Sequence, residues 1–254
     1  MSKIAIIAAM EREITPLVRG WQCSALPAGS TVSSGQREFP CFERDGVVAV
    51  VSGIGCKNAE LAARAVVAQY RPEILVSVGL AGGLIRSLKV GSIFTPNVVV
   101  DAADGTEYRC KADGNHVSGG VLVSAGEIFG AEAKRELVNR FHGLVVDMEA
   151  AGVAKAAQEA QIGFRCVKAI SDEADFIMPP MGEFVSAAGE FQSRRFALWA
   201  AVRPWQWPGI LALARNSKRA IEALCNKLQS DMAGGLPPKE VVTLDRTEFL
   251  EAKR

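Results

Sequence analysis

The sequence has almost no net charge, although it carries many charged residues. Its 254 residues include 29 Lys and Arg and 28 Asp and Glu, which leaves a formal charge of +1 at pH 7. Proteins that bind nucleic acid usually have a basic face and a high pI, so we expect no nucleic-acid partner. Intrinsically disordered chains combine few hydrophobic residues with a high net charge, and a hydrophobic content of 49% excludes that class as well.

Clusters of metal-binding residues are also missing. The chain has two histidines, and its six cysteines lie at least fifteen positions apart, with no CxxC pair (Cys23, Cys41, Cys56, Cys110, Cys166 and Cys225). Structural zinc sites need closely spaced thiols and imidazoles. We therefore expect no metal and no organic cofactor, and we interpret the cysteines as buried thiols of a cytoplasmic protein.

Long hydrophobic stretches are absent too. The apolar run over 3–10 ends at Glu11-Arg12-Glu13, is short for a signal peptide, and lacks a cleavage-like sequence after it. A later apolar segment is interrupted by Arg203, Pro204 and Pro208, which argues against a membrane-spanning helix. We interpret the first run as a buried strand.

Continuous apolar runs, which are typical of buried parallel strands, recur along the chain. The clear runs are 3–9, 47–52, 74–78 and 164–170, and two shorter ones are 93–100 and 144–148. The spacing of Ala, Leu and Val predicts helices over 57–70 and 149–161. Strands that alternate with helices predict an α/β domain with a twisted, mostly parallel central sheet.

Two segments depart from this pattern. Residues 176–208 are rich in Pro and Gly and carry several large aromatic residues, among them Phe184, Phe191, Phe196, Trp199, Trp205 and Trp207. We interpret them as a long excursion before a last helix over 209–228. The tail over 231–254 contains Gly-Gly and Pro-Pro pairs followed by mixed charges, and we expect it to be loosely held. The sequence thus predicts a single domain over 1–230.

Acidic and glycine-rich segments follow four of the predicted strands. Because ligands bind beyond the carboxyl ends of strands in open α/β sheets, these segments are candidates for one crevice. They are 10–13, 79–84, 147–149 and 171–175. Each has a structural alternative, since an acid after a strand often caps a helix and a glycine often marks a tight turn. The glycines match neither a dinucleotide fingerprint nor a P-loop.

Together the four segments resemble the nucleoside phosphorylase family, with the closest likeness to its methylthioadenosine/S-adenosylhomocysteine nucleosidase branch. The resemblance runs from residue 3 to about 175 and resumes in the last helix. It is carried by Ala8-Ala9-Met10-Glu11-Arg12-Glu13, Val78-Gly79-Leu80-Ala81-Gly82-Gly83-Leu84, Val146-Asp147-Met148-Glu149-Ala150-Ala151 and Val167-Lys168-Ala169-Ile170-Ser171-Asp172-Glu173-Ala174-Asp175. It implies a mixed central sheet flanked by helices, as in nucleoside phosphorylases, and a homodimer.

The resemblance also implies cleavage of a purine N-glycosidic bond by water. Asp172 would protonate the departing base, and Glu13 would deprotonate the attacking water. Glu149 would accept hydrogen bonds from the ribose hydroxyls and stabilise the developing cation. The further substrate-binding residues that the resemblance implies are Met148, Ile128, Phe129, Leu80, Ala81, Gly82, Ser171 and Lys168.

Two departures from the nucleosidase pattern keep alternatives open. Leu80 stands where nucleosidases have Ser, and Lys168 where they have Arg; Leu cannot hydrogen-bond, and Lys lacks the planar fork of Arg. A phosphorylase that uses inorganic phosphate is the first alternative, although Ser77 occupies the place of the arginine that holds phosphate in that branch. A non-catalytic nucleoside-binding module is the second.

The excursion over 176–208 also has two interpretations. Its aromatic residues could be core or subunit-interface residues. They could instead form an enlarged apolar pocket, or a membrane-facing patch, for a nucleoside with a large apolar 5′ group. The second interpretation agrees with a likeness of the Gly-Leu-Ala-Gly-Gly segment and the Pro-rich stretch to the hopanoid-associated phosphorylase-like branch.

Overall fold

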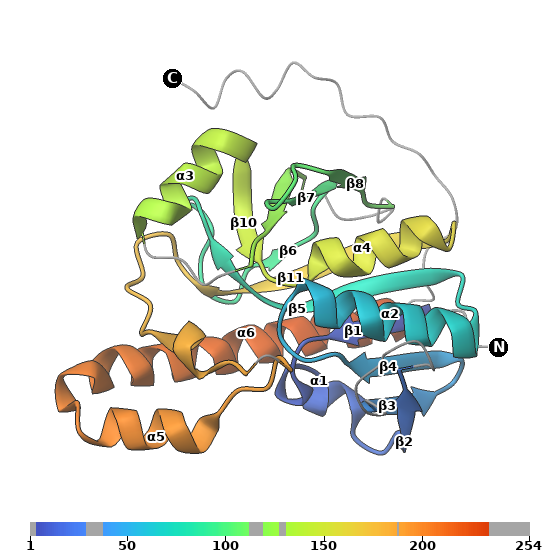
Figure 1. Ribbon diagram of the computed structural model, residues 1–254, viewed down its shortest axis with the longest axis horizontal. Helices are drawn as coiled ribbons and strands as arrows, with labels where there is room; N and C mark the ends of the chain where they lie inside the picture. The colour runs from blue at the N-terminus through green and yellow to red at the C-terminus, as the bar shows by residue number, and fades with distance from the viewer. Residues whose placement is uncertain (1–3, 29–37, 112–118, 127–130, 187, 234–254) are drawn as a thin grey trace.

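The computed structural model describes residues 4–28, 38–111, 119–126, 131–186 and 188–233. These residues form one α/β body built on a large mixed sheet (Figure 1). The strands follow the order β2-β3-β4-β1-β5-β10-β9-β7-β8, and β11 lies off this path, paired with β5 and β6. The predicted fold class is therefore confirmed.

The bounds of the strands are as follows. They are β1 (Ile4–Ala8), β2 (Gln22–Pro27), β3 (Glu38–Arg44), β4 (Val47–Val51), β5 (Ile74–Gly83), β6 (Ile93–Phe94), β7 (Val98–Asp101), β8 (Glu107–Arg109), β9 (Val121–Ser124), β10 (Gly143–Asp147) and β11 (Gly163–Asp172). The α-helices are α1 (Glu11–Val18), α2 (Cys56–Tyr70), α3 (Ala131–Phe141), α4 (Ala150–Glu159), α5 (Ser193–Ala201) and α6 (Trp207–Ala233), with short 3₁₀ turns η1 (Met181–Phe184) and η2 (Pro204–Gln206).

Strand β5 is the hub of the sheet. Its first half lies between β1 and β11, both parallel to it, and its last residues pair antiparallel with β10. We expected the strand to stop at Val78 and to be followed by a glycine-rich turn. That expectation was wrong, because the backbone stays extended and paired with β11 as far as Gly82, and the glycines lie inside a strand.

The two faces of the sheet are covered by different helices. Alternate residues of β1 point to opposite sides, since side chains in a strand alternate. Ala5 and Ile7 belong to the core that includes α2 and α4, whereas Ile6 and Ala8 belong to the core that includes α1 and α6. Both cores are buried, so the central strands read as continuous apolar runs rather than alternating ones.

Several sequence expectations needed correction. The run over 93–100 is divided into β6 and β7 by Thr95, Pro96 and Asn97, since proline cannot donate to a strand ladder. Strands β2, β3, β8 and β9 and helices α1, α3 and α5 were not predicted at all. Of the six cysteines, Cys41, Cys166 and Cys225 are buried as expected, but Cys23 is exposed.

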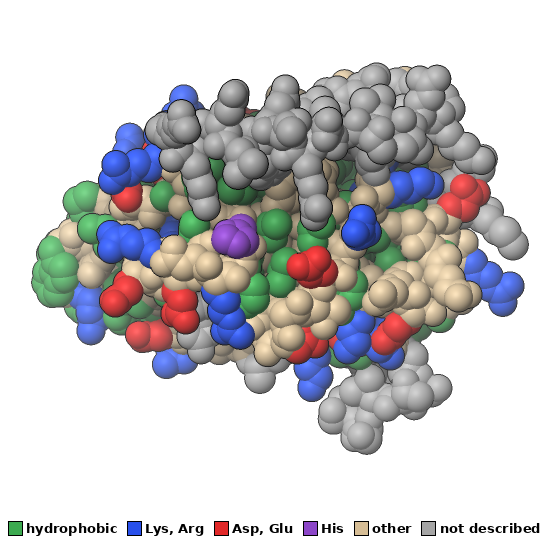
Figure 2. Space-filling view, turned by 90° about the horizontal axis from the view of Figure 1, so that it is seen from above, with side chains coloured by type: hydrophobic (Ala, Val, Ile, Leu, Met, Phe, Trp, Pro, Cys, Tyr) green, Lys and Arg blue, Asp and Glu red, His purple; other side chains and the backbone are tan. Residues whose placement is uncertain are grey.

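The excursion contains α5 and η2, which form a hairpin with the first half of α6. Figure 1 shows this hairpin extending to the left of the sheet, and Figure 2 shows hydrophobic side chains gathered at the same end of the molecule. Helix α6 starts before the predicted residue 209 and ends at Ala233, so it enters the first residues of the expected tail. Most of that tail lies outside the described residues, and its loose attachment stays a prediction. Within the described part of the chain, no helix is both long and apolar enough to cross a bilayer.

Candidate active site

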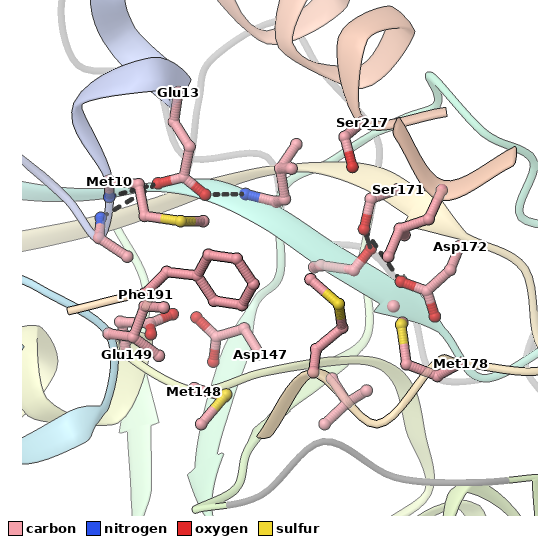
Figure 3. Close-up of a pocket in the computed structure, with 18 of the residues that line it drawn as sticks. Met10, Glu13, Asp147, Met148, Glu149, Ser171, Asp172, Met178, Phe191 and Ser217 are labelled. Carbon is pink, nitrogen blue, oxygen red and sulfur yellow. Dashed lines mark hydrogen bonds between the residues drawn. The ribbon is translucent and has the colours of Figure 1, made fainter. Parts of the chain in front are cut away.

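One cavity lies where the carboxyl ends of β1, β5 and β11 meet (Figure 3). Its volume of about 170 Å³ is far above the roughly 10–15 Å³ that one water molecule needs on the same measure. Glu13, Glu149 and Asp172 all line it, although they lie far apart in the chain. In Figure 3, Glu13 and Glu149 lie toward one end of the cavity and Asp172 toward the other.

Glu13 is held by three backbone N–H groups. Its Oε2 accepts hydrogen bonds from Ala9 at 3.1 Å and Met10 at 3.0 Å, and its Oε1 accepts one from Leu80 at 3.2 Å. The side chain is 2% exposed. Burial raises the pKa of Glu13 above its usual value, while the N–H groups and the charge of Lys168 act in the opposite direction. The site therefore favours the protonated form of Glu13 more than water does, which suits a group that must accept a proton.

Asp172 is held by two side chains at the other end. Its Oδ2 accepts a hydrogen bond from Lys134 Nζ at 2.6 Å, and its Oδ1 accepts one from Ser171 Oγ at 2.9 Å. The Lys134 and Asp172 side chains are each 5% exposed, so this ion pair is almost fully desolvated. Sequence reasoning missed Lys134, because it lies on the polar helix α3 with no motif around it.

Glycines of β5 make room for both carboxylates. A Cβ on Gly79 would lie 3.2 Å from Glu13 Oε2, and a Cβ on Gly82 would lie 2.9 Å from Asp172 Oδ2. Gly79 also has φ +144, which other residues rarely adopt. The glycines therefore allow a strand to pass directly beside two buried acids, which is a close-approach role rather than a turn.

Lys168 lies beneath the cavity, and the lining does not include it. Its Nζ is 2.8 Å from Asp147 Oδ2, with the two side chains 1% and 0% exposed. Burial acts to lower the pKa of Lys168, but the carboxylate of Asp147, helped by other neighbours, raises it above its usual value. Lys168 is therefore a charged group that pairs with Asp147. The direct contact between Lys168 and a substrate that the resemblance implied stays a prediction, because Lys168 does not line the cavity.

Asp147 organises the start of α4 and, through it, Glu149. Besides Lys168, it accepts hydrogen bonds from the Ser124 hydroxyl and from the N–H of Ala150. Glu149 Oε1 accepts the N–H of Gly55 at 2.8 Å. Burial, followed by the neighbouring charge of Asp147, raises the pKa of Glu149 to about 7. Glu149 occupies the N-cap position of α4 without a side-chain capping bond, and Asp147 accepts the N–H of Ala150 instead.

The remaining predicted residues divide into two groups. Met148, Leu80, Ala81, Gly82 and Ser171 line the cavity as expected. Ile128 and Phe129 lie outside the described residues, so their contact with a base stays a prediction. The lining also includes apolar side chains that the motifs did not reveal, namely Met178, Met181, Val185, Phe191 and Leu213.

Comparison with known proteins identifies the family. The model of the Phosphorylase superfamily matches residues 3–117 and 104–201. This chain belongs to that superfamily. A Bacillus subtilis relative named 5′-methylthioadenosine/S-adenosylhomocysteine nucleosidase is 30% identical over 203 residues, covering 67% of this chain and 85% of the relative.

Two solved structures share the fold of this chain. The Neisseria meningitidis 5′-methylthioadenosine/S-adenosylhomocysteine nucleosidase, in complex with methylthio-immucillin-A, has a TM-score of 0.67 and 20% identity over 92% of this chain and 100% of its own. The futalosine hydrolase of Helicobacter pylori has a TM-score of 0.67 and 18% identity over 92% of this chain and 98% of its own. At these identities the structures support the fold.

The approach of Gly82 to Asp172 leads to a prediction. We expect Gly82→Ala to push the Asp172 carboxylate out of place, because the new Cβ would lie 2.9 Å from Oδ2. The loss should be about tenfold or more in kcat/KM for nucleoside cleavage, which corresponds to about 1.4 kcal/mol of transition-state stabilisation. A retained far-ultraviolet circular dichroism spectrum would show that the fold is intact. Wild-type kcat/KM in the variant would contradict the close contact.

The raised pKa of Glu149 leads to a second prediction. The folded protein keeps the Glu149 proton up to about pH 7, whereas the unfolded chain releases it near pH 4.5. The folded state therefore loses stability as the pH rises between these two values. We expect Glu149→Gln to remove that contribution, because the amide can still accept the Gly55 N–H but cannot titrate. Urea unfolding of both proteins from pH 5 to 8 should show the wild type losing up to about 1.4 kcal/mol per pH unit relative to the variant. Parallel stability curves would contradict the assignment.

Proposed function

We propose that this protein cleaves the N-glycosidic bond of a purine nucleoside with water, and that it acts on 5′-substituted adenosines such as methylthioadenosine or S-adenosylhomocysteine. The observation that carries the proposal is the placement of Glu13 and Glu149 toward one end of a single cavity and Asp172 toward the other. The names of two curated relatives support the same reaction.

The proposed reaction needs an acid for the base and a base for the water. Asp172 passes a proton, drawn from the Lys134 ammonium 2.6 Å from its Oδ2, to purine N7, so that the base departs as a neutral molecule while the C–N bond breaks. Lys134 and Ser171 hold the Asp172 carboxyl in the orientation needed for this transfer. Glu13 accepts a proton from the attacking water, whose oxygen forms the new bond to the anomeric carbon.

Glu149 lies on the same side as Glu13 and acts on the sugar. Its carboxylate would accept hydrogen bonds from the ribose hydroxyls and stabilise the positive charge that develops on the ribosyl group. The Gly55 N–H bond fixes one of its oxygens. Met148 precedes it in the chain and also lines the cavity, where it can contact the sugar.

The charge of the site supports water rather than phosphate as the nucleophile. Glu13 and Glu149 are both buried carboxyl groups at the end where the nucleophile would bind, and in the ionised forms that the proposed reaction uses they would repel a phosphate dianion. The Lys168 ammonium is engaged by Asp147, and Ser77 is fully buried in β5. Arg12, which lines the cavity, is the feature that favours phosphorolysis as the second candidate.

The apolar side chains of the lining support a substrate with a large apolar 5′ group. Met178, Met181 and Phe191 line the cavity, and flexible or aromatic apolar side chains suit an aliphatic substituent. Such a group would add favourable burial of about 0.8 kcal/mol per CH₂.

Homodimer assembly and a cytoplasmic location stay predictions.

The function is tested by incubating the protein with a panel of purine nucleosides that carry methylthio, homocysteinyl or long alkyl groups at C5′. We expect adenine and the free sugar to appear in phosphate-free buffer. Strict dependence on phosphate, with a sugar 1-phosphate as product, would favour the phosphorylase alternative. Binding of adenine nucleosides without cleavage under either condition would favour the non-catalytic binding module.

Asp172→Asn connects the activity to this cavity. The variant cannot donate a proton to N7, and we expect kcat to fall by about 10²-fold or more. Asp175→Asn is the matched control, because Asp175 lies three residues further on and its side chain is 68% exposed. Equal activity of the Asp172 variant and this control would remove Asp172 from the mechanism.

A further inference from the structure

The exposed large hydrophobic residues of the described chain are concentrated in one structural unit. Five of the six lie on the α5–α6 hairpin, which we define as residues 193–219. They are Leu198, Val202, Trp205, Trp207 and Leu211, with exposures of 74%, 68%, 70%, 48% and 60%. Figures 1 and 2 place this hairpin at one end of the molecule, where hydrophobic side chains gather on the surface. Large contiguous apolar patches on a protein surface usually mark a binding face.

The end of the hairpin has a defined structure. Trp207 Nε1 donates a hydrogen bond to the carbonyl of Ala200 at 2.9 Å, which joins α6 to the end of α5. Arg203 donates to the carbonyl of Trp199 at 3.0 Å and lies over its ring. On its inner side, α5 contributes Phe196 and Trp199 to an aromatic cluster with Phe184. The exposed residues are therefore presented by an ordered element.

The hairpin also has an unusual charge distribution. From 191 to 221 the sequence contains six cationic residues and no Asp or Glu (Arg194, Arg195, Arg203, Arg215, Lys218 and Arg219). The whole chain has a net charge of only +1, so this positive charge is strongly local. Five of the six side chains are exposed, and Arg203 is half-buried.

Counted outward from the turn of the hairpin, apolar residues come first and cationic residues second on both helices. On α5, Arg194 and Leu198 are four residues apart and Val202 follows at the same spacing, so they share one face. On α6, the residues Trp207, Leu211 and Arg215 are also four positions apart, but here the apolar residues precede the cation in the sequence. Lys218 follows Arg215. Because α5 runs toward the turn of the hairpin and α6 runs away from it, both helices have apolar residues near the turn and cations behind them.

We propose that the α5–α6 hairpin docks on the surface of an anionic lipid bilayer. Tryptophan side chains favour the membrane–water interface, and Leu198, Val202 and Leu211 would enter the acyl boundary beside them. Arg194, Arg215 and Lys218, about one to two turns behind, would reach the lipid phosphates. The hairpin lies on the bilayer without crossing it.

The charge pattern argues against a second copy of this chain as the occupant. A two-fold dimer through this face would bring the same surface of both copies together. Six cations would then face six cations with no acidic residue between 191 and 221 to compensate them. A bilayer supplies both an apolar layer and anionic phosphates, in the order that the hairpin presents.

Docking would also bring the cavity close to the bilayer. Leu213 and Ser217 of α6 line the cavity, and Ser217 is ten residues from Trp207, which is about 15 Å of helix. The position of the cavity does not depend on which nucleoside is cleaved, so the membrane proposal stands independently of the proposed function.

The proposal is tested by co-sedimentation of the full chain with vesicles. Vesicles of phosphatidylcholine with a quarter of phosphatidylglycerol should bind the protein in 50 mM salt, and vesicles of phosphatidylcholine alone should bind it much less. Raising the salt to 500 mM should weaken binding, because it screens the cations. The pair Arg194→Gln and Lys218→Gln should reduce partitioning about thirtyfold, from about 1 kcal/mol per cation. The pair Leu198→Ser and Leu211→Ser should also abolish most of the binding.

Matched controls separate the hairpin from the rest of the surface. Lys57→Gln with Arg109→Gln removes two exposed cations elsewhere, and Ile177→Ser removes the sixth exposed apolar side chain, which lies outside the hairpin. Both should bind vesicles as the wild type does. Thermal unfolding followed by circular dichroism should be unchanged in every variant, because the substituted side chains are exposed.

Three results would overturn the proposal. The first is no binding to anionic vesicles. The second is equal binding by the hairpin variants and the wild type. The third is a dimer in sedimentation equilibrium that the Leu198→Ser and Leu211→Ser pair dissociates while vesicles remain unbound, which would identify the hairpin as an interface between copies.

Discussion

The arrangement of the site depends on how closely β5 passes two buried acids. This strand pairs with β1, β11 and β10, so its backbone cannot move without disturbing most of the sheet. A Cβ on Gly82 would collide with Asp172, and one on Gly79 would crowd Glu13 and be strained at φ +144. Two carboxyl groups are thereby fixed against one rigid strand, with a cavity between them. Rigid support of this kind is what acid–base chemistry requires, because a small displacement of a catalytic group lowers the rate sharply.

A buried network of charges around Asp147 supports the part of the cavity where Glu149 lies. Lys168 and Asp147 form an ion pair with almost no exposure to water, and such a pair is costly to desolvate. Its cost is offset by further hydrogen bonds, because Asp147 also receives the Ser124 hydroxyl and the Ala150 N–H. The network fixes the start of α4 and thus the backbone of Glu149. Lys168 therefore has a structural role through its charge.

The sequence revealed the parts of the structure that have a local or strongly apolar signal. The runs over 47–52 and 164–170 predicted β4 and β11 because strands buried on both faces need continuous apolar residues. Strand β2 carried no such signal, since all but one of its residues are exposed. Lys134 could not be assigned to the site, because its contact with Asp172 joins residues 38 positions apart and depends on where α3 packs. The glycines were identified, but their role required knowing which carboxylate lies beside each of them.

We propose that Asp172 and Glu149 act on the base and the sugar of one bound nucleoside. A crystal structure of the wild-type protein with a non-hydrolysable 5′-methylthioadenosine analogue tests this placement most directly. We expect purine N7 within about 3 Å of an Asp172 oxygen, with the ribose hydroxyls on Glu149. A base bound away from Asp172, or an analogue bound outside this cavity, would contradict it.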